Sequence, residues 1–157
     1  MGCAMQDKIN ISSLEDHTGY WLRCVSNYVS HAFARKLAEK DVTVAEWALM
    51  RVLYGQELLA PSRIAEQMGM TKGAITKLVD RLIAKSLVVR EACAEDGRAQ
   101  TIRLTKKGAQ FVPKLAALAD QNDKECFLHL SHDDQQTLQR ILRGLASKFG
   151  ITSVAID

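Results

Sequence analysis

The 157-residue sequence has few of the residues that mark special structural classes. It contains 2 Pro and 9 Gly, which excludes collagen-like and low-complexity chains. Only 6% of its residues are aromatic, so its core must consist mainly of aliphatic side chains and Met. No apolar run approaches the roughly 18 residues that a membrane span needs. We therefore expect one compact globular domain with no membrane partner.

The sequence also lacks the patterns of a metal site, a secretory signal or an enzyme. Its four cysteines form no Cys-x-x-Cys pair. Cys126, His129 and His132 are spaced three residues apart, a spacing that would not keep all three side chains on one side of a helix, so no metal is expected. The start resembles an acylation signal, but Gln6 stands where myristoylation needs Ser or Thr. No phosphate-binding loop, dinucleotide fingerprint or nucleophile elbow occurs. We expect a cytoplasmic protein, neither an enzyme nor a cofactor carrier.

The net charge of +3 is small, but the basic residues are unevenly distributed. Residues 62–107 contain ten Lys or Arg against five Asp or Glu, a local net charge of +5, and the rest of the chain carries −2. A basic middle third suits an anionic partner such as nucleic acid, although a solvated charged face has the same composition. Charge alone leaves both interpretations open.

Helical periodicity predicts a long first helix from Leu14 to about Glu39. Its apolar stripe is broader than a small domain normally covers, so part of it is expected to pack against a second copy of the chain. Further helices are expected after the candidate caps Thr43, Thr105 and Ser131. The stripe consists of Trp21, Leu22, Val25, Tyr28, Val29, Ala32, Phe33 and Leu37.

The stretch after Pro61 has the spacing of a helix-turn-helix motif. Pro61 suits the first position of a helix, and Ala65 is small where the second helix must cross closely. Gly69 can take the positive φ of the turn, and Thr71 is the natural cap of a second helix over residues 72–85. The apolar residues expected to fix the angle between the two helices are Ile64, Met68, Met70, Ile75 and Leu78.

The second helix of this motif presents short or basic side chains outward at its N-terminal end. Such a surface suits insertion into the major groove, where the helix dipole and the lysines face phosphate. Helix pairs with a tight Gly turn also occur in domains that bind no DNA. The residues predicted to contact bases or phosphates are Ser62, Thr71, Lys72, Gly73, Thr76, Lys77 and Arg81.

A change to two-residue periodicity after Ser86 predicts a β-hairpin with strands Leu87–Glu91 and Gln100–Leu104. A helix-turn-helix followed directly by a hairpin is a winged helix, with residues 92–99 as the wing.

The wing carries Arg98, which is predicted to enter the adjacent minor groove. Asp96 is expected to pair with Arg98 or with Arg90, and Arg90 and Asp96 complete the predicted DNA-binding set. The alternative is that Asp96 and Arg98 form an exposed ion pair in a turn, worth about 0 to 1 kcal/mol.

With these segments in this order, the chain from about Leu14 to Phe149 resembles the MarR family of bacterial transcriptional regulators. The most specific segments are Leu78-Val79-Asp80-Arg81-Leu82, Leu87-Val88-Val89-Arg90, and Asp96-Gly97-Arg98 followed by Leu104-Thr105. The resemblance implies a homodimer that presents two recognition helices and two wings to a pseudo-palindromic operator in double-stranded DNA. It also implies, for many members, release from DNA by a small phenolic or lipophilic acid, and for others a response to cysteine oxidation.

We therefore expect a mostly α chain with a small β-hairpin, in which a winged helix-turn-helix region is flanked by N- and C-terminal dimerisation helices. The dimerisation helices are assigned to residues 14–40 and 107–150, and the DNA-binding region to residues 43–105. The function expected is that of a DNA-binding transcriptional regulator, and the family resemblance implies that it is a repressor. The alternative is a winged-helix module that binds another protein and little DNA.

The expected effector site consists of Tyr20, Trp21, Trp47 and Arg51, because aromatic walls and one cation suit a planar anion. The alternative is that Trp21 and Trp47 are core or dimer-interface residues. Gly19 stands where the hydroperoxide-sensing members carry their reactive cysteine, so that role does not transfer. Cys24 is expected to be an inert buried thiol, and Cys93 the more exposed one.

Overall fold

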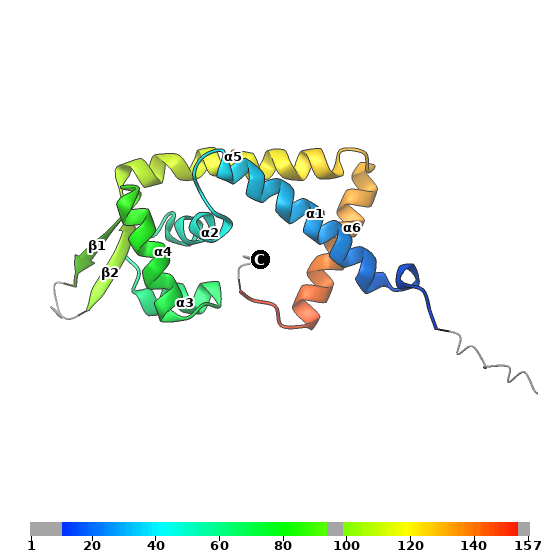
Figure 1. Ribbon diagram of the computed structural model, residues 1–157, viewed down its shortest axis with the longest axis horizontal. Coiled ribbons are helices and arrows are strands. Elements are labelled where there is room, and N and C mark those ends of the chain that lie inside the picture. The colour runs from blue at the N-terminus through cyan, green and yellow to red at the C-terminus, as the bar shows by residue number, and fades with distance from the viewer. Residues whose placement is uncertain (1–10, 94–98, 154–157) are drawn as a thin grey trace, which may run out of the picture.

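The computed structural model describes residues 11–93 and 99–153. In Figure 1, the helix over residues 106–127 runs along most of the molecule, with the helices of residues 44–84 and the hairpin toward one end and the helices of residues 18–38 and 132–148 toward the other. The elements are a 3-10 turn at Leu14–Asp16, then α1 (Thr18–Ala38), α2 (Val44–Leu53), α3 (Pro61–Met68), α4 (Lys72–Ala84), β1 (Val88–Ala92), β2 (Gln100–Leu104), α5 (Lys106–Phe127) and α6 (His132–Lys148). The expected mostly α fold with one small hairpin is confirmed.

Hydroxyl caps begin the helices where the sequence places them. The side-chain oxygens of Thr43, Thr71, Thr105 and Ser131 each accept a hydrogen bond from the backbone N–H three residues on, at 2.9–3.2 Å. Each bond satisfies one of the N–H groups that a helix start leaves without an intrahelical partner. Pro61 occupies the first turn of α3, as expected from its missing N–H.

Two predicted boundaries are wrong by a few residues. The first helix does not run unbroken from Leu14, because His17 adopts an extended conformation (φ −98°, ψ 121°) and separates the 3-10 turn from α1. The first strand is Val88–Ala92 rather than Leu87–Glu91. Ser86, at φ +60°, still belongs to the turn after α4, so Leu87 precedes the strand instead of opening it.

The hairpin is antiparallel, with Val88 opposite Leu104 and Ala92 opposite Gln100. Leu59, in the loop before α3, adds a single bridge to the far side of β2 by exchanging two backbone hydrogen bonds with Ile102, at 2.8 and 3.0 Å. This bridge fixes the base of the hairpin to the entrance of the helix-turn-helix.

The core lies between α2, α4, the hairpin and the first half of α5. Leu49, Met50, Ile75, Leu82 and Leu115 are among its fully buried side chains. Gly108 marks the closest approach, because a Cβ there would collide with the carbonyl oxygen of Leu87. Its missing side chain lets α5 start directly against the strand connection.

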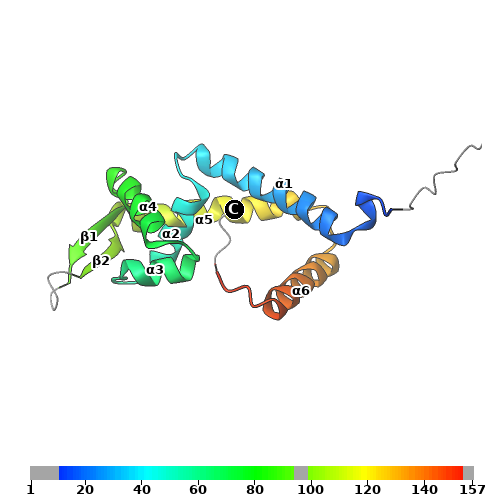
Figure 2. The same ribbon diagram turned by 60° about the horizontal axis from the view of Figure 1, so that its bottom comes forward.

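The other end of the molecule leaves apolar surface uncovered within the single chain. Helix α1 packs on α5 but exposes about half of Leu22 and Val25, and α6 buries no residue. Figure 2 shows α6 projecting away from α1 and α5. In the part of the chain that the structure describes, no helix is long and apolar enough to cross a membrane.

Candidate nucleic-acid interface

Helices α3 and α4 form the expected helix-turn-helix. Gly69 ends α3 in the left-handed region at φ +62°, and the backbone N–H of Met70 donates to the Ala65 carbonyl at 3.0 Å. This geometry closes α3 in the way that αL glycines do and turns the chain toward α4. Ala65 is 7% exposed, so the two helices cross as closely as predicted. All five predicted angle-fixing residues are buried or half-buried.

The outward face of α4 carries the side chains that the sequence predicts. The buried face of α4 consists of Ile75, Leu78, Val79 and Leu82. The opposite face exposes Lys72, Gly73, Thr76, Lys77, Asp80 and Arg81, and Ser62 and Thr71 are also exposed. One side of a single helix therefore combines three cations with short side chains at its N-terminal end.

Two of the hydroxyl groups are already engaged within the motif. The Thr71 oxygen accepts the cap hydrogen bond from Ala74, which leaves its hydroxyl proton free to donate to an acceptor such as phosphate. The Thr76 hydroxyl donates instead to the Lys72 carbonyl at 3.0 Å. Thr76 can therefore still accept a hydrogen bond while it stays bound to its own helix.

An ion pair links α4 to the wing. Arg90 on β1 contacts the carboxylate of Asp80 on α4, with 2.5 Å between its guanidinium nitrogen and Oδ1. Arg90 is half-buried and Asp80 exposed, so the pair lies at the seam between the two elements. Arg90 was one of the two partners expected for Asp96, and it is bound to Asp80 instead. Asp96 itself lies outside the described residues. Asp80, an acid on an otherwise basic face, has a structural role in this arrangement.

A cross-strand ion pair stiffens the hairpin. Arg103 on β2 donates from Nε to the Glu91 carboxylate at 2.7 Å, and this hydrogen bond together with the charge of Glu91 raises the pKa of Arg103 above its ordinary value. Sequence reasoning did not single out this pair. Opposite charges two residues from direct register on one face of a hairpin are the signal that could have found it.

Arg98 and Asp96 lie outside the described residues, and their predicted roles stay predictions. The strands reach the tip in register, because the backbone N–H of Cys93 donates to the Ala99 carbonyl at 2.7 Å.

The four candidate effector residues lie in two separate places. Tyr20 and Trp21 contact each other edge to face near the start of α1, at 5.3 Å between ring centroids. Trp47 packs edge to face on Phe33, thirteen residues further along α1, which is about 20 Å of helix rise. Arg51 lies over the Tyr54 ring at 5.8 Å. The expectation that the first two helices bring the four together is wrong within one chain.

The expected burial of the cysteines is also wrong. Cys24 is exposed, and Cys93 is half-buried. Cys126, His129 and His132 lie around the turn between α5 and α6. Among the residues described, no three His, Cys, Asp or Glu side chains are placed to hold a metal ion.

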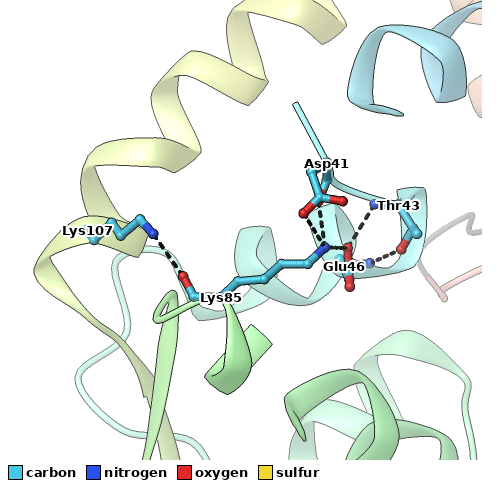
Figure 3. Close-up of polar contacts among 5 residues, drawn as sticks. All are labelled: Asp41, Thr43, Glu46, Lys85 and Lys107. Carbon is cyan, nitrogen blue, oxygen red and sulfur yellow. Dashed lines mark hydrogen bonds and ion pairs between the residues drawn. The ribbon is translucent and has the colours of Figure 1, made fainter. Parts of the chain in front are cut away.

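Sequence reasoning missed a polar cluster behind α4, drawn in Figure 3. Glu46 is 1% exposed, and its carboxylate accepts from the Thr43 backbone N–H at 2.9 Å and from Lys85 Nζ at 3.0 Å. Lys85 also donates to the Asp41 carbonyl, and its own carbonyl accepts from Lys107 Nζ at 2.9 Å. The capping-box spacing Thr-x-x-Glu was the available signal.

Comparison with known proteins shows what the winged-helix part of the chain is similar to. Residues 40–99, which span α2 to the wing, match the model of the MarR family. The HTH-type transcriptional regulator PrsX of Escherichia coli is 33% identical over 87 residues, which cover 55% of this chain and 52% of PrsX. The chain thus spans about half the length of this relative.

A longer alignment extends the likeness beyond the winged helix. The HTH-type transcriptional repressor IacR of Pseudomonas putida is 27% identical over 128 residues, covering 82% of this chain and 77% of IacR. Residues 40–99 of the chain thus resemble the MarR family. The fold of the chain is similar to that of the MepR–DNA complex of S. aureus, with a TM-score of 0.72 at 23% identity over 84% of this chain and 98% of that one. That likeness shows the fold.

Proposed function

We propose that this chain is a homodimeric DNA-binding transcriptional regulator of the MarR family that works in the cytoplasm. Helix α4 enters the major groove of a pseudo-palindromic operator, and the wing at residues 92–99 lies against the minor groove. The observation that carries the proposal is the face of α4, where Lys72, Lys77 and Arg81 are exposed opposite a fully apolar buried face. A helix fixed on one side and basic on the other fits the groove of an anionic duplex.

The comparisons support the DNA partner. PrsX and IacR are named as transcriptional regulator and repressor, and MepR was solved with DNA. We propose repression as the mode of action of this chain, following the name of IacR, and release by a small lipophilic or phenolic acid as its control.

The uncovered apolar surface supports the homodimer. Leu22 and Val25 on α1 are each 51% exposed, and Ile141, Leu142 and Leu145 on α6 are 39–47% exposed. Surface of this kind on two helices marks an interaction site, and a second copy offers the same apolar helices in return. The proposed dimerisation helices, residues 14–40 and 107–150, include both.

The experiment is a titration of labelled DNA from the region upstream of the gene, with random duplex as competitor, at two salt concentrations. Lys77→Gln removes one cation from the exposed face of α4 without touching its buried face. If Lys77 contacts a phosphate, the affinity falls and the slope of log affinity against log salt decreases by about 1. Lys124→Gln, an exposed lysine of α5, is the matched control and should change neither quantity.

Equal, weak and competitor-sensitive binding by the wild type and both variants would contradict the proposal. Such a result would favour the alternative of a protein-binding winged helix. Asp80, an acid on the otherwise basic face of α4, does not favour that alternative, because its charge is matched by Arg90.

A further inference from the structure

The exposed face of α4 carries a single uncharged side chain, that of Thr76. The other residues of this face are three cations, the Asp80 carboxylate bound to Arg90, and Gly73. Lysine and arginine contact any phosphate as well as guanine, so their presence alone does not specify a base. Thr76 is therefore the residue whose own geometry limits the base that it can read.

The hydroxyl group of Thr76 is bonded to its own helix. It donates to the Lys72 carbonyl oxygen at 3.0 Å, the bond that threonine commonly makes one turn back along a helix. This bond uses the one hydroxyl proton and restricts rotation about the Cα–Cβ bond. The methyl group is then the part of the side chain that stays without a partner in the helix. The oxygen can still accept a hydrogen bond, a role that valine at this position would abolish.

Gly73 leaves room for a base beside this methyl group. It lies three residues before Thr76, about one turn along the same face of α4. A Cβ on Gly73 would meet no atom within 4 Å, so the space over this turn is open. The turn belongs to the N-terminal end of α4, the end with which recognition helices contact base edges. A base edge can therefore approach the helix next to the Thr76 methyl.

We propose that Thr76 reads thymine, through contact of its methyl group with the C5-methyl group of the base in the major groove. Thymine is the base that presents a methyl group there, and the threonine methyl is one of the apolar groups that contact it. The contact removes apolar surface of both groups from water, which favours thymine over cytosine at this position. This assignment rests on the proposed DNA-binding function and adds to it the identity of one base in each half-site.

The probe for this contact is a DNA duplex that the wild-type protein selects from a random pool. Deoxyuridine then replaces one thymine of each half-site, position by position. Deoxyuridine pairs as thymine does and lacks only the C5-methyl group. At one position we expect the affinity to fall about tenfold, because the two half-sites each lose a methyl contact worth about three- to fourfold.

Three variants assign this effect to the Thr76 methyl group. Thr76→Ser removes the methyl and keeps the hydroxyl, so deoxyuridine at that position should change its affinity by no more than about twofold. Thr76→Val keeps a methyl and removes the hydroxyl, and should retain most of the deoxyuridine effect. Thr101→Ser on β2 is the matched control, because the Thr101 hydroxyl also donates to a backbone carbonyl, that of Glu91. It should show the full effect.

A deoxyuridine effect that persists in Thr76→Ser would overturn the assignment of thymine to Thr76. Loss of the effect in Thr76→Val would make the hydroxyl oxygen the reading group and would overturn it as well. Selected duplexes in which no thymine responds to deoxyuridine overturn the base assignment alone. If the wild type enriches no duplex from the pool, the proposed DNA-binding function fails, and the base assignment fails with it.

Discussion

Glu46 is the residue whose environment departs most from that of an ordinary surface acid. Its carboxylate is removed from water and satisfied by the Thr43 N–H and the Lys85 ammonium. A buried charge is tolerated only while such partners remain. This one side chain therefore couples the start of α2 to the end of α4.

Replacing Lys85 by Ala should lower the free energy of unfolding by about 2–3 kcal/mol, because it leaves the Glu46 carboxylate buried without its cation. Urea unfolding measures the change, with Lys40→Ala in the neighbouring loop as the control, expected within about 0.5 kcal/mol of wild type. The double variant Glu46→Gln, Lys85→Ala should recover part of the loss. A loss below about 0.5 kcal/mol for Lys85→Ala would show that the pair does not hold the two helices.

The stability of the folded state should depend on the ionisation of Glu125 at acid pH. Its carboxylate accepts from Lys36 Nζ of α1, and this bond, with a second from Gln121, lowers the pKa of Glu125 below its ordinary 4.5. The folded state then holds the ionised form more tightly than the unfolded chain does. The stabilisation is present above about pH 4.5 and is lost as the pH falls through the lowered pKa.

Glu125→Gln should therefore be less stable than wild type at pH 7 and should approach it as the pH falls below 4.5. Thermal unfolding across this pH range measures the difference. In a Lys36→Gln background, the same substitution should lose most of its pH dependence, because the partner is gone. A difference that is constant with pH would contradict the role of this pair.

At the scale of elements, the properties of α4 follow from its sequence to a large extent. The spacing of Ile75, Leu78 and Leu82 predicts the buried face, and Thr71 and Gly69 predict its start and the turn before it. Periodicity cannot predict that Asp80 pairs with Arg90 or that Lys85 reaches Glu46, because both contacts join residues from different elements. Periodicity also predicted that Cys24 is buried, and this was wrong. An apolar stripe shows which side of a helix is apolar, but it does not show which part of that side is covered by the same chain.

A substitution at Gly73 tests the stability of α4 and its proposed DNA contact separately. A Cβ at this position would meet no atom within 4 Å, and the backbone is helical, so Gly73→Ala should raise the free energy of unfolding by up to about 1 kcal/mol. If the DNA approaches this turn closely, the same methyl group should lower DNA affinity severalfold.

The control for this substitution is Gly144→Ala in α6, where an added Cβ also meets open space. It should stabilise the fold in the same way. Because Gly144 lies on a proposed dimerisation helix, DNA affinity is compared at protein concentrations at which both variants are dimeric, and there it should equal that of the wild type. Thermal unfolding and a DNA titration measure the two effects. Stabilisation of Gly73→Ala with unaltered DNA affinity would remove this turn of α4 from the interface.

At the scale of the whole molecule, one part of the chain buries its apolar residues in its own core, and another part leaves apolar residues exposed. The winged helix has a continuous core from α2 to α5, and its helix order and hairpin were predictable from periodicity and caps. The position of α6 was not predictable, because Ile141, Leu142 and Leu145 of its apolar stripe remain 39–47% exposed in the described part of the chain. A surface left uncovered by one chain is explained by the proposed second copy.

The most direct test of the account is selection of binding sites from a random DNA duplex pool by the purified protein, with its mass in the complex measured in parallel. A dimer with two α4 helices predicts two-fold symmetric sites whose half-site centres lie about 10 base pairs, or about 34 Å, apart. The bound protein should have twice the 17.4 kDa of one chain. Failure to enrich any sequence, or enrichment of a single half-site by one chain, would contradict the dimeric DNA-binding regulator proposed for this fold.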